Sequence, residues 1–259
     1  NESVGVLTGK ALDFGGSLVR TEATGYGTCY FMREMLKVNN DDFDGKKVII
    51  SGSGNVAIYA MEKTIELGGK VIAMSDSSGY VYSVNGLDLD KMKQIKEEKR
   101  LRIDEYIKLD KDAIFSNTGS IWDVSCDIAL PCATQNELEK KHAELLVRGG
   151  LIAIAEGANM PCTPEAVEVF QKNKIPFGPG KASNAGGVAV SGLEMSQNSI
   201  RDSWDFDKVD KKLQGIMKSI HDNSYEASKK YGDKGNYVMG ANIFGFQKVA
   251  NAMISQGIV

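Results

Sequence analysis

One stretch, residues 46–57, constrains the fold more than any other. Two lysines lead into the apolar, β-branched run Val-Ile-Ile, and a Gly-x-Gly-x-x-Ala turn follows. Apolar residues then recur at helical spacing from Val56 to Leu67, and Gly68-Gly69 ends the pattern. Strand, tight turn and helix in this order are the context in which such glycines indicate dinucleotide binding. A purely structural strand-to-helix turn is the alternative.

Two glycines of this turn have defined roles in a dinucleotide site. Gly52 allows the sharp turn between strand and helix. Gly54 lacks a Cβ, so the backbone can approach a pyrophosphate that lies on the N-terminus of the following helix. Ala57 in the third position still permits close packing of the helix on the sheet. The stretch therefore predicts a dinucleotide-binding turn.

Composition excludes several classes of partner. The 259-residue chain has a formal net charge of −3, so no overall basic field predicts a nucleic-acid or membrane partner. No apolar run reaches membrane-spanning length. The cysteines are scattered without a Cys-x-x-Cys pair, which predicts reduced thiols in a cytoplasmic protein and no metal site. They are Cys29, Cys126, Cys132 and Cys162.

The rest of the chain alternates between strand and helix patterns. Strands are predicted at 70–76, 126–132 and 151–155, and helices at 136–147 and 164–173. This alternation predicts an α/β fold with a Rossmann-like, doubly wound and mostly parallel sheet, covered by helices on both faces. Helical sequence after residue 205 predicts a helical C-terminal extension.

The chain divides into three predicted parts. Residues 1–20 are polar and glycine-punctuated and have no initiator methionine, so we expect an interdomain connector within a longer chain. Residues 21–236 form the predicted dinucleotide-binding domain, and residues 237–259 the C-terminal helix. Within the domain, the small-residue stretch 176–187 is predicted to be a long functional loop leading into a helix at 188–199.

The end of the second strand bears on the choice of coenzyme. It lies about 20 residues beyond the glycine turn, where dinucleotide folds place the group that binds the adenosine ribose. Asp76 at this point would accept from both ribose hydroxyls and repel a 2′-phosphate. Ser77 and Ser78 beside it can donate to a phosphate. The signal is therefore mixed, because Asp76 favours NAD whereas the two serines favour tolerance of NADP.

A charged helix predicted at 89–101 adds cations to this question. Lys96, Lys99 and Arg102 are spaced by three and would line up towards Asp76 to hold a 2′-phosphate. Such a charged run usually forms a solvated helix face, and the phosphate-binding arrangement is the alternative to it.

Polar loops follow the other predicted strands as well. They contain Ala133, Thr134 and Gln135, and Ala158 and Asn159. Because the carboxyl ends of parallel strands meet at one edge, these loops and the glycine turn converge there. His142 and His221 are isolated in amphipathic helices and are predicted to be surface or core residues.

Read together, the loops resemble glutamate dehydrogenase of the hexameric kind, over nearly the whole chain. The segments that carry the resemblance are 15–20, 22–27, 51–57, 129–138, 155–161, 184–188, 191–198 and 237–243. The resemblance implies the coenzyme-binding domain of an enzyme that reversibly deaminates L-glutamate to 2-oxoglutarate and ammonia by hydride transfer. Its catalytic lysines and aspartate belong to an earlier substrate domain, which we expect to lie outside this chain.

The resemblance also implies an assembly. The parent is expected to be a homohexamer whose contacts are made mainly by the missing substrate domain. We therefore expect the isolated chain to be a monomer or dimer that binds coenzyme but contains no catalytic residue and is nearly inactive. The C-terminal helix is expected to pack on the missing domain.

Site roles carry over to matching positions. Thr24 and Asn159 are expected at the nicotinamide end, with Ala133, Thr134 and Gln135 near its ribose. The pyrophosphate is expected to be bound by Gly52, Ser53, Gly54, Asn55 and Val56. Val188 and Ser191 are expected in the glutamate side-chain pocket, with the serine hydroxyl facing the γ-carboxylate and Asn184 near the α-amino end.

The resemblance also bears on coenzyme and substrate. NAD-using relatives tend to carry a bulky apolar residue at the position of Ser53 and an acid at that of Ser78. This chain has neither and resembles the NADP-using bacterial type, so NADP is favoured and NAD is the alternative. A leucine or phenylalanine dehydrogenase should have an apolar residue at Ser191, and a stand-alone nucleotide-binding regulator has no use for the Val188 and Ser191 pocket.

Overall fold

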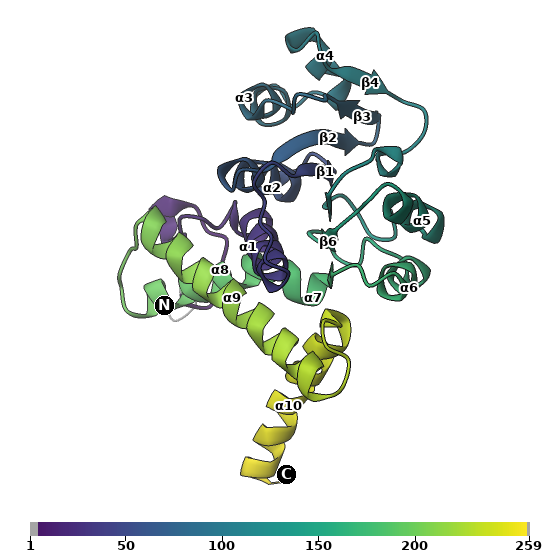
Figure 1. The fold of residues 1–259 in the computed structure, drawn as a ribbon. Coiled ribbons are helices and arrows are strands. Elements are labelled where there is room, and N and C mark those ends of the chain that lie inside the picture. The colour runs from purple at the N-terminus through teal and green to yellow at the C-terminus, as the bar shows by residue number, and fades with distance from the viewer. Residues whose placement is uncertain (1–4, 258–259) are drawn as a thin grey trace.

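The apolar run after Lys46 forms β1, the central strand of a seven-stranded sheet (Figure 1). The computed structural model describes residues 5–257, so the first four residues of the expected connector and the last two of the expected final helix lie outside it. The strands are β1 (Lys47–Ser51), β2 (Lys70–Asp76), β3 (Gly79–Tyr82), β4 (Ile114–Ser116), β5 (Ile128–Pro131), β6 (Ala153–Ala155) and β7 (Phe177–Gly178).

Helices connect and cover these strands. They are α1 (Ala23–Val38), α2 (Asn55–Glu66), α3 (Leu89–Lys93), α4 (Tyr106–Leu109), α5 (Lys140–Arg148), α6 (Pro164–Lys172), α7 (Gly180–Ser183), α8 (Gly186–Ser199), α9 (Phe206–Lys230) and α10 (Tyr237–Gln256). Shorter helical turns are the 3-10 turns Leu12–Phe14, Ile103–Glu105 and Ile121–Asp123 and the π turn Gln94–Glu98.

The strand order is β4-β3-β2-β1-β5-β6-β7. β1 pairs in parallel with β2 on one side and with β5 on the other, and the chain then continues outward through β6 and β7. The order therefore reverses between β1 and β5, which is where open α/β sheets bind ligands. Only Ser77 and Ser78 join β2 to β3, so that pair is an antiparallel hairpin. The predicted doubly wound, mostly parallel sheet is confirmed.

Alternation along β1 builds a core on each face of the sheet. Val48 and Ile50 are fully buried in a cluster with Phe31 of α1, whereas Ile49 is buried in a second cluster with Phe170 of α6. Successive side chains of a strand point to opposite faces, so a strand buried on both sides has an unbroken apolar sequence. Figure 1 shows α5 and α6 on one side of the sheet and α1 and α2 on the other.

Three predicted elements differ from the structure. The predicted helix 136–147 begins only at Lys140, because residues before it pair with the chain after β6: the Leu138 N–H donates to the Pro161 carbonyl at 2.9 Å. The predicted loop 176–187 contains β7 and α7. The predicted helix 89–101 leaves α-helical geometry after Lys93, and Arg100 is in the left-handed region with φ of 53°.

The C-terminal helices form a separate layer, and α10 extends away from the sheet (Figure 1). Its first turns pack closely on α9, since a Cβ at Gly240 would lie 1.9 Å from the Ser224 carbonyl oxygen. Its later turns expose large apolar side chains, with Phe246 at 70% and Ile254 at 81% exposure. Among the described residues, no helix is long and apolar enough to cross a membrane.

Candidate functional site

The glycine turn lies at the carboxyl end of β1, wedged between the ends of β2 and β5. Gly52 has φ of +86°, and a Cβ on it would lie 2.9 Å from the Ala133 Cα. Its N–H donates to the Ser75 Oγ at 3.1 Å. These contacts account for a glycine at position 52 without any ligand.

Gly54 differs from Gly52 in its surroundings. It is exposed, and a Cβ on it would meet nothing within 4 Å. α2 begins at the next residue, and no side chain caps its N-terminus. The first N–H groups of α2 therefore face open space beside a residue without a side chain, which suits the close approach of a phosphate.

The loop after β5 is held by one carboxylate. Glu137 Oε1 accepts from the Ser51 Oγ at 2.8 Å and from the N–H groups of Ala133 and Thr134 at 3.1 and 3.3 Å. Burial raises the pKa of Glu137, although these hydrogen bonds oppose the shift. Ala133, Thr134 and Gln135 are exposed at the edge of the sheet. Sequence reasoning gave Glu137 no role, and the only signal was an acid closely following the polar loop.

The loop after β6 approaches the same edge. Asn184 Nδ2 donates to the Asn159 Oδ1 at 2.8 Å and to the Ala158 carbonyl at 3.2 Å. A Cβ at Gly187 would lie 2.6 Å from the Thr24 Oγ1, so the start of α8 touches the start of α1. The residues predicted for the nicotinamide end, Thr24 and Asn159, are thus linked through one loop and lie beside the predicted substrate residue Asn184.

A buried acid supports this loop from behind. The Glu156 side chain accepts from the Gly180 N–H at 2.6 Å and from the Cys162 N–H at 3.2 Å. Burial raises the pKa of Glu156, and the hydrogen bonds only partly offset it. Glu156 therefore fixes the start of α7 relative to β6 and does not face a ligand.

Asp76 at the end of β2 is engaged on both oxygens. Its Oδ1 accepts from the Ser78 N–H at 2.8 Å and the Ser78 Oγ at 2.5 Å. Its Oδ2 accepts from the Ile103 N–H at 2.9 Å and the Lys96 Nζ at 3.2 Å. Burial alone would raise the pKa of Asp76, but these donors outweigh it and lower that pKa. The expected acceptor for two ribose hydroxyls has no lone pair left over, because a carboxylate offers about four sites.

The cations near Asp76 are not arranged as the spacing predicted. Lys96 reaches Asp76 from the π turn, and Arg102 donates to the Ser77 hydroxyl from the extended segment after the turn. Lys99 is exposed, and no hydrogen bond or ion pair between described residues joins it to them. The expectation of one helical face holding all three is wrong, since the α-helix ends before Lys96.

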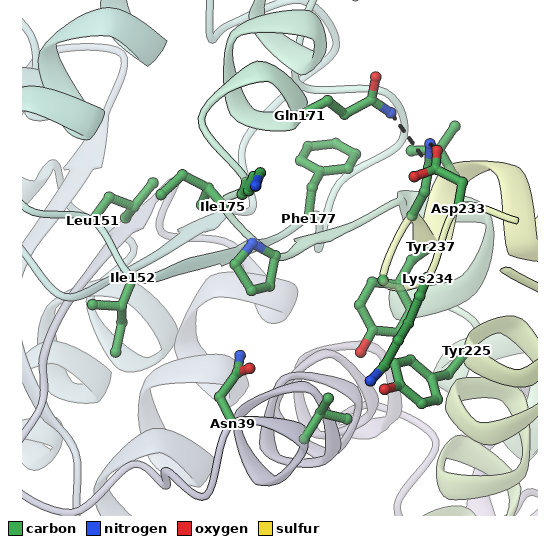
Figure 2. A pocket seen from close by; sticks show the side chains of 16 residues that line it. Asn39, Leu151, Ile152, Gln171, Ile175, Phe177, Tyr225, Asp233, Lys234 and Tyr237 are labelled. Atoms are coloured by element: carbon green, nitrogen blue, oxygen red, sulfur yellow. Dashed lines mark hydrogen bonds between the residues drawn. The ribbon is translucent and has the colours of Figure 1, made fainter. Parts of the chain in front are cut away.

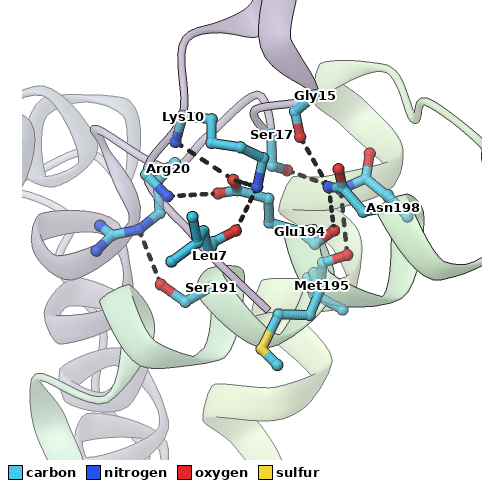
Figure 3. A network of polar contacts seen from close by, with 12 residues as sticks. Leu7, Lys10, Gly15, Ser17, Arg20, Ser191, Glu194, Met195 and Asn198 are labelled. Atoms are coloured by element: carbon cyan, nitrogen blue, oxygen red, sulfur yellow. Dashed lines mark hydrogen bonds and ion pairs between the residues drawn. The ribbon is translucent and has the colours of Figure 1, made fainter. Parts of the chain in front are cut away.

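Val188 and Ser191, predicted for the glutamate side-chain pocket, lie on α8, and Ser191 belongs to a polar network (Figure 3). Val188 is 72% exposed, and the Ser191 Oγ accepts from the Arg20 Nε at 3.0 Å. One turn on, the fully buried Glu194 accepts from the Lys10 Nζ at 2.7 Å and from the Gly9 N–H at 2.9 Å. Burial opposes ionisation of Glu194, but Lys10 and the backbone donors lower its pKa.

Arg20 is a residue that sequence reasoning did not assign. Its Nε donates to the Ser191 hydroxyl, and the exposed Val188 lies one helical turn before Ser191 on α8. Its position within the segment 15–20 was the available signal.

Other chemistry finds no support among residues 5–257. No group of three or more histidine, cysteine or acidic side chains there could hold a metal ion. His221 is a core residue whose Nε2 lies 3.0 Å from the Tyr237 hydroxyl, and His142 Nδ1 accepts from the Glu139 N–H at 3.1 Å.

Comparison with known proteins identifies the family to which the chain belongs. The family model of glutamate/leucine/phenylalanine/valine dehydrogenases matches residues 15–257. The chain belongs to this dehydrogenase family. The dehydrogenase-family match includes every residue predicted for the site, from Thr24 to Ser191.

Curated relatives of this dehydrogenase chain are longer than it is. It is 55% identical over 266 residues to a glutamate dehydrogenase of Bacteroides thetaiotaomicron, covering 100% of this chain and 59% of the relative. It is 50% identical over 265 residues to an NADP-specific glutamate dehydrogenase of Helicobacter pylori, with the same coverage. The chain thus spans about 59% of the length of these relatives.

Solved structures agree with the sequence comparison. The crystal structure of Plasmodium falciparum glutamate dehydrogenase superposes with a TM-score of 0.94 and 46% identity, over 98% of this chain and 55% of that one.

Proposed function

We propose that this chain is the coenzyme-binding part of an NADP-preferring glutamate dehydrogenase. The parent enzyme then catalyses the reversible oxidative deamination of L-glutamate to 2-oxoglutarate and ammonia. The observation that carries the proposal is the set of polar loops around Gly54 at the β1–β5 reversal, where a backbone without side chain faces open space. The printed names of the relatives at about 50% identity support the choice of reaction.

Each loop at the sheet edge holds a different part of the coenzyme. Gly52, Ser53, Gly54, Asn55 and Val56 hold the pyrophosphate through the N-terminus of α2. Ala133, Thr134 and Gln135 hold the ribose next to the nicotinamide, with Glu137 fixing the backbone of the first two. Thr24 and Asn159 orient the nicotinamide ring, which when bound accepts or delivers the hydride.

The α8 network provides the uncharged and cationic part of the substrate pocket. Arg20 and Ser191 together offer N–H and O–H donors, which suit the γ-carboxylate of glutamate better than an apolar side chain. Val188 lies next to them as an exposed apolar wall. Asn184, tied to Asn159, lies near the α-amino end and links the substrate to the nicotinamide loop.

The Asp76 cluster provides the preference for NADP. Because the Asp76 carboxylate is paired with Lys96 and accepts hydrogen bonds from the hydroxyl and N–H of Ser78, its repulsion of a 2′-phosphate is reduced. Arg102 and the Ser77 hydroxyl then supply donors, whereas the hydroxyl and the N–H of Ser78 already donate to Asp76. A phosphate of nearly two charges gains most from charge-assisted hydrogen bonds. Lys99 lies on the exposed part of the same segment and can add only a screened contribution.

Calorimetric titration of the 259-residue chain with NADP⁺ and with NAD⁺ tests this preference. We expect NADP⁺ to bind about tenfold more tightly or better, and Ser78→Glu to remove that difference by placing an acid beside Asp76. Ser255→Glu, on the exposed end of α10, adds the same charge elsewhere and should change nothing. A wild-type chain that prefers NAD⁺ would sink the proposal.

Two other functions lead to different measurements. A leucine- or phenylalanine-type dehydrogenase would turn over apolar amino acids, and the polar pair of Arg20 and Ser191 argues against it. A stand-alone nucleotide-binding regulator would not respond to Ser191→Ala. In the glutamate dehydrogenase proposed here, that substitution in the full-length parent raises the KM for glutamate while leaving NADP⁺ affinity unchanged.

The remaining partners are also proposed from the structure. The exposed apolar side chains of α10 suit packing on a substrate domain of the parent enzyme. We take the parent to be a homohexamer and the isolated chain to be a monomer or dimer. These side chains are Phe246, Val249, Met253 and Ile254. Hydrogen exchange at these residues should be slower in the parent than in the 259-residue chain. The four buried, free thiols fit a cytoplasmic protein.

A further inference from the structure

A cleft of about 860 Å³ lies at the edge of the sheet opposite to the glycine turn (Figure 2). Leu151 and Ile152 come immediately before β6, and Ile175 comes just before β7, so these residues mark the amino ends of the strands. The C-terminal part of α9, with Tyr225, and the turn after it, with Lys234, close the other side of the cleft. None of the residues proposed for coenzyme or glutamate lines it.

The wall formed by the sheet is apolar. Leu151 and Phe177 are 3% and 4% exposed, and Ile152 and Ile175 are half-buried beside them. Figure 2 shows these side chains on one side of the cleft and Tyr225, Lys234 and Tyr237 on the other. A ligand with an apolar body would therefore be sheltered from water along the sheet side.

The charge at the rim is positive. Lys174 and Lys234 both line the cleft, and neither has a carboxylate within 4.0 Å among the described residues. The one acid in the lining, Asp233, already accepts from the Asn236 Nδ2 at 2.6 Å. Neighbouring lysines outside the cleft are paired, for example Lys172 with Glu168 at 3.1 Å.

We propose that this cleft is a binding site for a small organic monoanion with an apolar or aromatic body. Its carboxylate or sulfonate lies at the rim that Lys174 and Lys234 make positive, and its body lies on Ile152, Ile175 and Phe177. The volume lies within the range of about 300–1,000 Å³ that is usual for small-molecule sites. Because β6 and β7 separate the two edges of the sheet, the ligand and the coenzyme bind at the same time.

Fluorescence titration of the 259-residue chain with the aromatic sulfonate 8-anilinonaphthalene-1-sulfonate tests the proposal. We expect saturable binding at one site, unaffected by saturating NADP⁺. Lys174→Glu/Lys234→Glu should weaken it about tenfold, since two attractive charges at the rim become two repulsive ones, a change of about 1.4 kcal/mol. If the charge-reversed variant fails to fold, the neutral variant Lys174→Gln/Lys234→Gln replaces it and should also weaken binding of the probe.

Two controls separate this cleft from other sites. Lys211→Glu makes a similar charge change on the exposed face of α9 and should leave binding intact. Phe246→Ser removes a side chain that is 70% exposed on α10, another apolar surface on which the probe could bind. Binding that disappears in Phe246→Ser but survives the lysine reversals overturns the proposal, and so does a wild-type chain that does not bind the probe. Neither result bears on NADP⁺ binding, which is measured separately.

Discussion

Gly52 and Gly54 allow the ligand contribution of the turn to be separated from its structural contribution. In Gly52→Ala, the new Cβ must adopt φ near +86° and lie 2.9 Å from the Ala133 Cα. The left-handed conformation costs about 1–2 kcal/mol and overpacking about 1–3 kcal/mol. We therefore expect the free energy of unfolding to fall by about 2–5 kcal/mol, measured by urea denaturation without coenzyme.

In Gly54→Ala the same added methyl should act in the opposite way. The backbone there has φ of −86° and ψ of −173°, which alanine adopts readily, and the Cβ meets no protein atom within 4 Å. Stability should stay constant or rise by about 0.4–1 kcal/mol, because the unfolded chain loses freedom. NADPH affinity, measured by fluorescence titration, should fall about tenfold or more, since the methyl occupies the face that the pyrophosphate approaches. If Gly54→Ala keeps its NADPH affinity to within about twofold, the pyrophosphate does not lie there and the reasoning fails.

Three further outcomes follow from the same structure. Burial lowers the pKa of His221 against the opposing effect of Asp222, so the unfolded chain takes up this proton first and stability falls as pH drops below about 6.5. Urea denaturation between about pH 5 and about pH 8 should therefore show a shallower loss of stability towards acid in His221→Gln than in the wild type. Some loss should remain in the variant, because the pKa of His142 is also lowered. Burial raises the pKa of the Cys29 thiol to about 12, and all four thiols are buried, so Ellman's reagent should react with them only after denaturation; rapid reaction of the folded chain would contradict this. The 259-residue chain should bind NADP⁺ but turn over glutamate at a negligible rate, and measurable steady-state turnover would mean that it contains its own catalytic acid and base.

The parts of the fold that could be predicted are those whose signal is local. β1, its turn and α2 follow from a contiguous run of apolar residues, glycines and helical spacing, and β2 matches the predicted residues 70–76. β4 and β7 have only three and two residues, which is too short for a periodic pattern. They are strands because neighbouring strands offer hydrogen bonds, and that information is absent from the local sequence.

The same distinction applies to the site. The predicted loops do converge at the β1–β5 reversal, because parallel strands bring their carboxyl ends to one edge whatever the loops contain. Glu137 and Arg20 were missed because their partners, Ser51 and Ser191, are distant in the sequence and meet them only after folding. Residues that bind a ligand through a motif can be read from the sequence, whereas residues that position the motif cannot.

Asp76 illustrates why a residue type at the right position does not decide specificity alone. An acid at the end of β2 predicts repulsion of a 2′-phosphate only if its charge faces the ligand unpaired. Here Ile103 and Lys96 approach Asp76 because the α-helix before them gives way to a π turn, which the charge spacing did not reveal. The carboxylate is consequently occupied by Ser78 and Lys96, and the Ser77–Arg102 pair remains to meet a phosphate. The residue that suggests NAD in the sequence thus becomes, in the fold, part of the case for NADP.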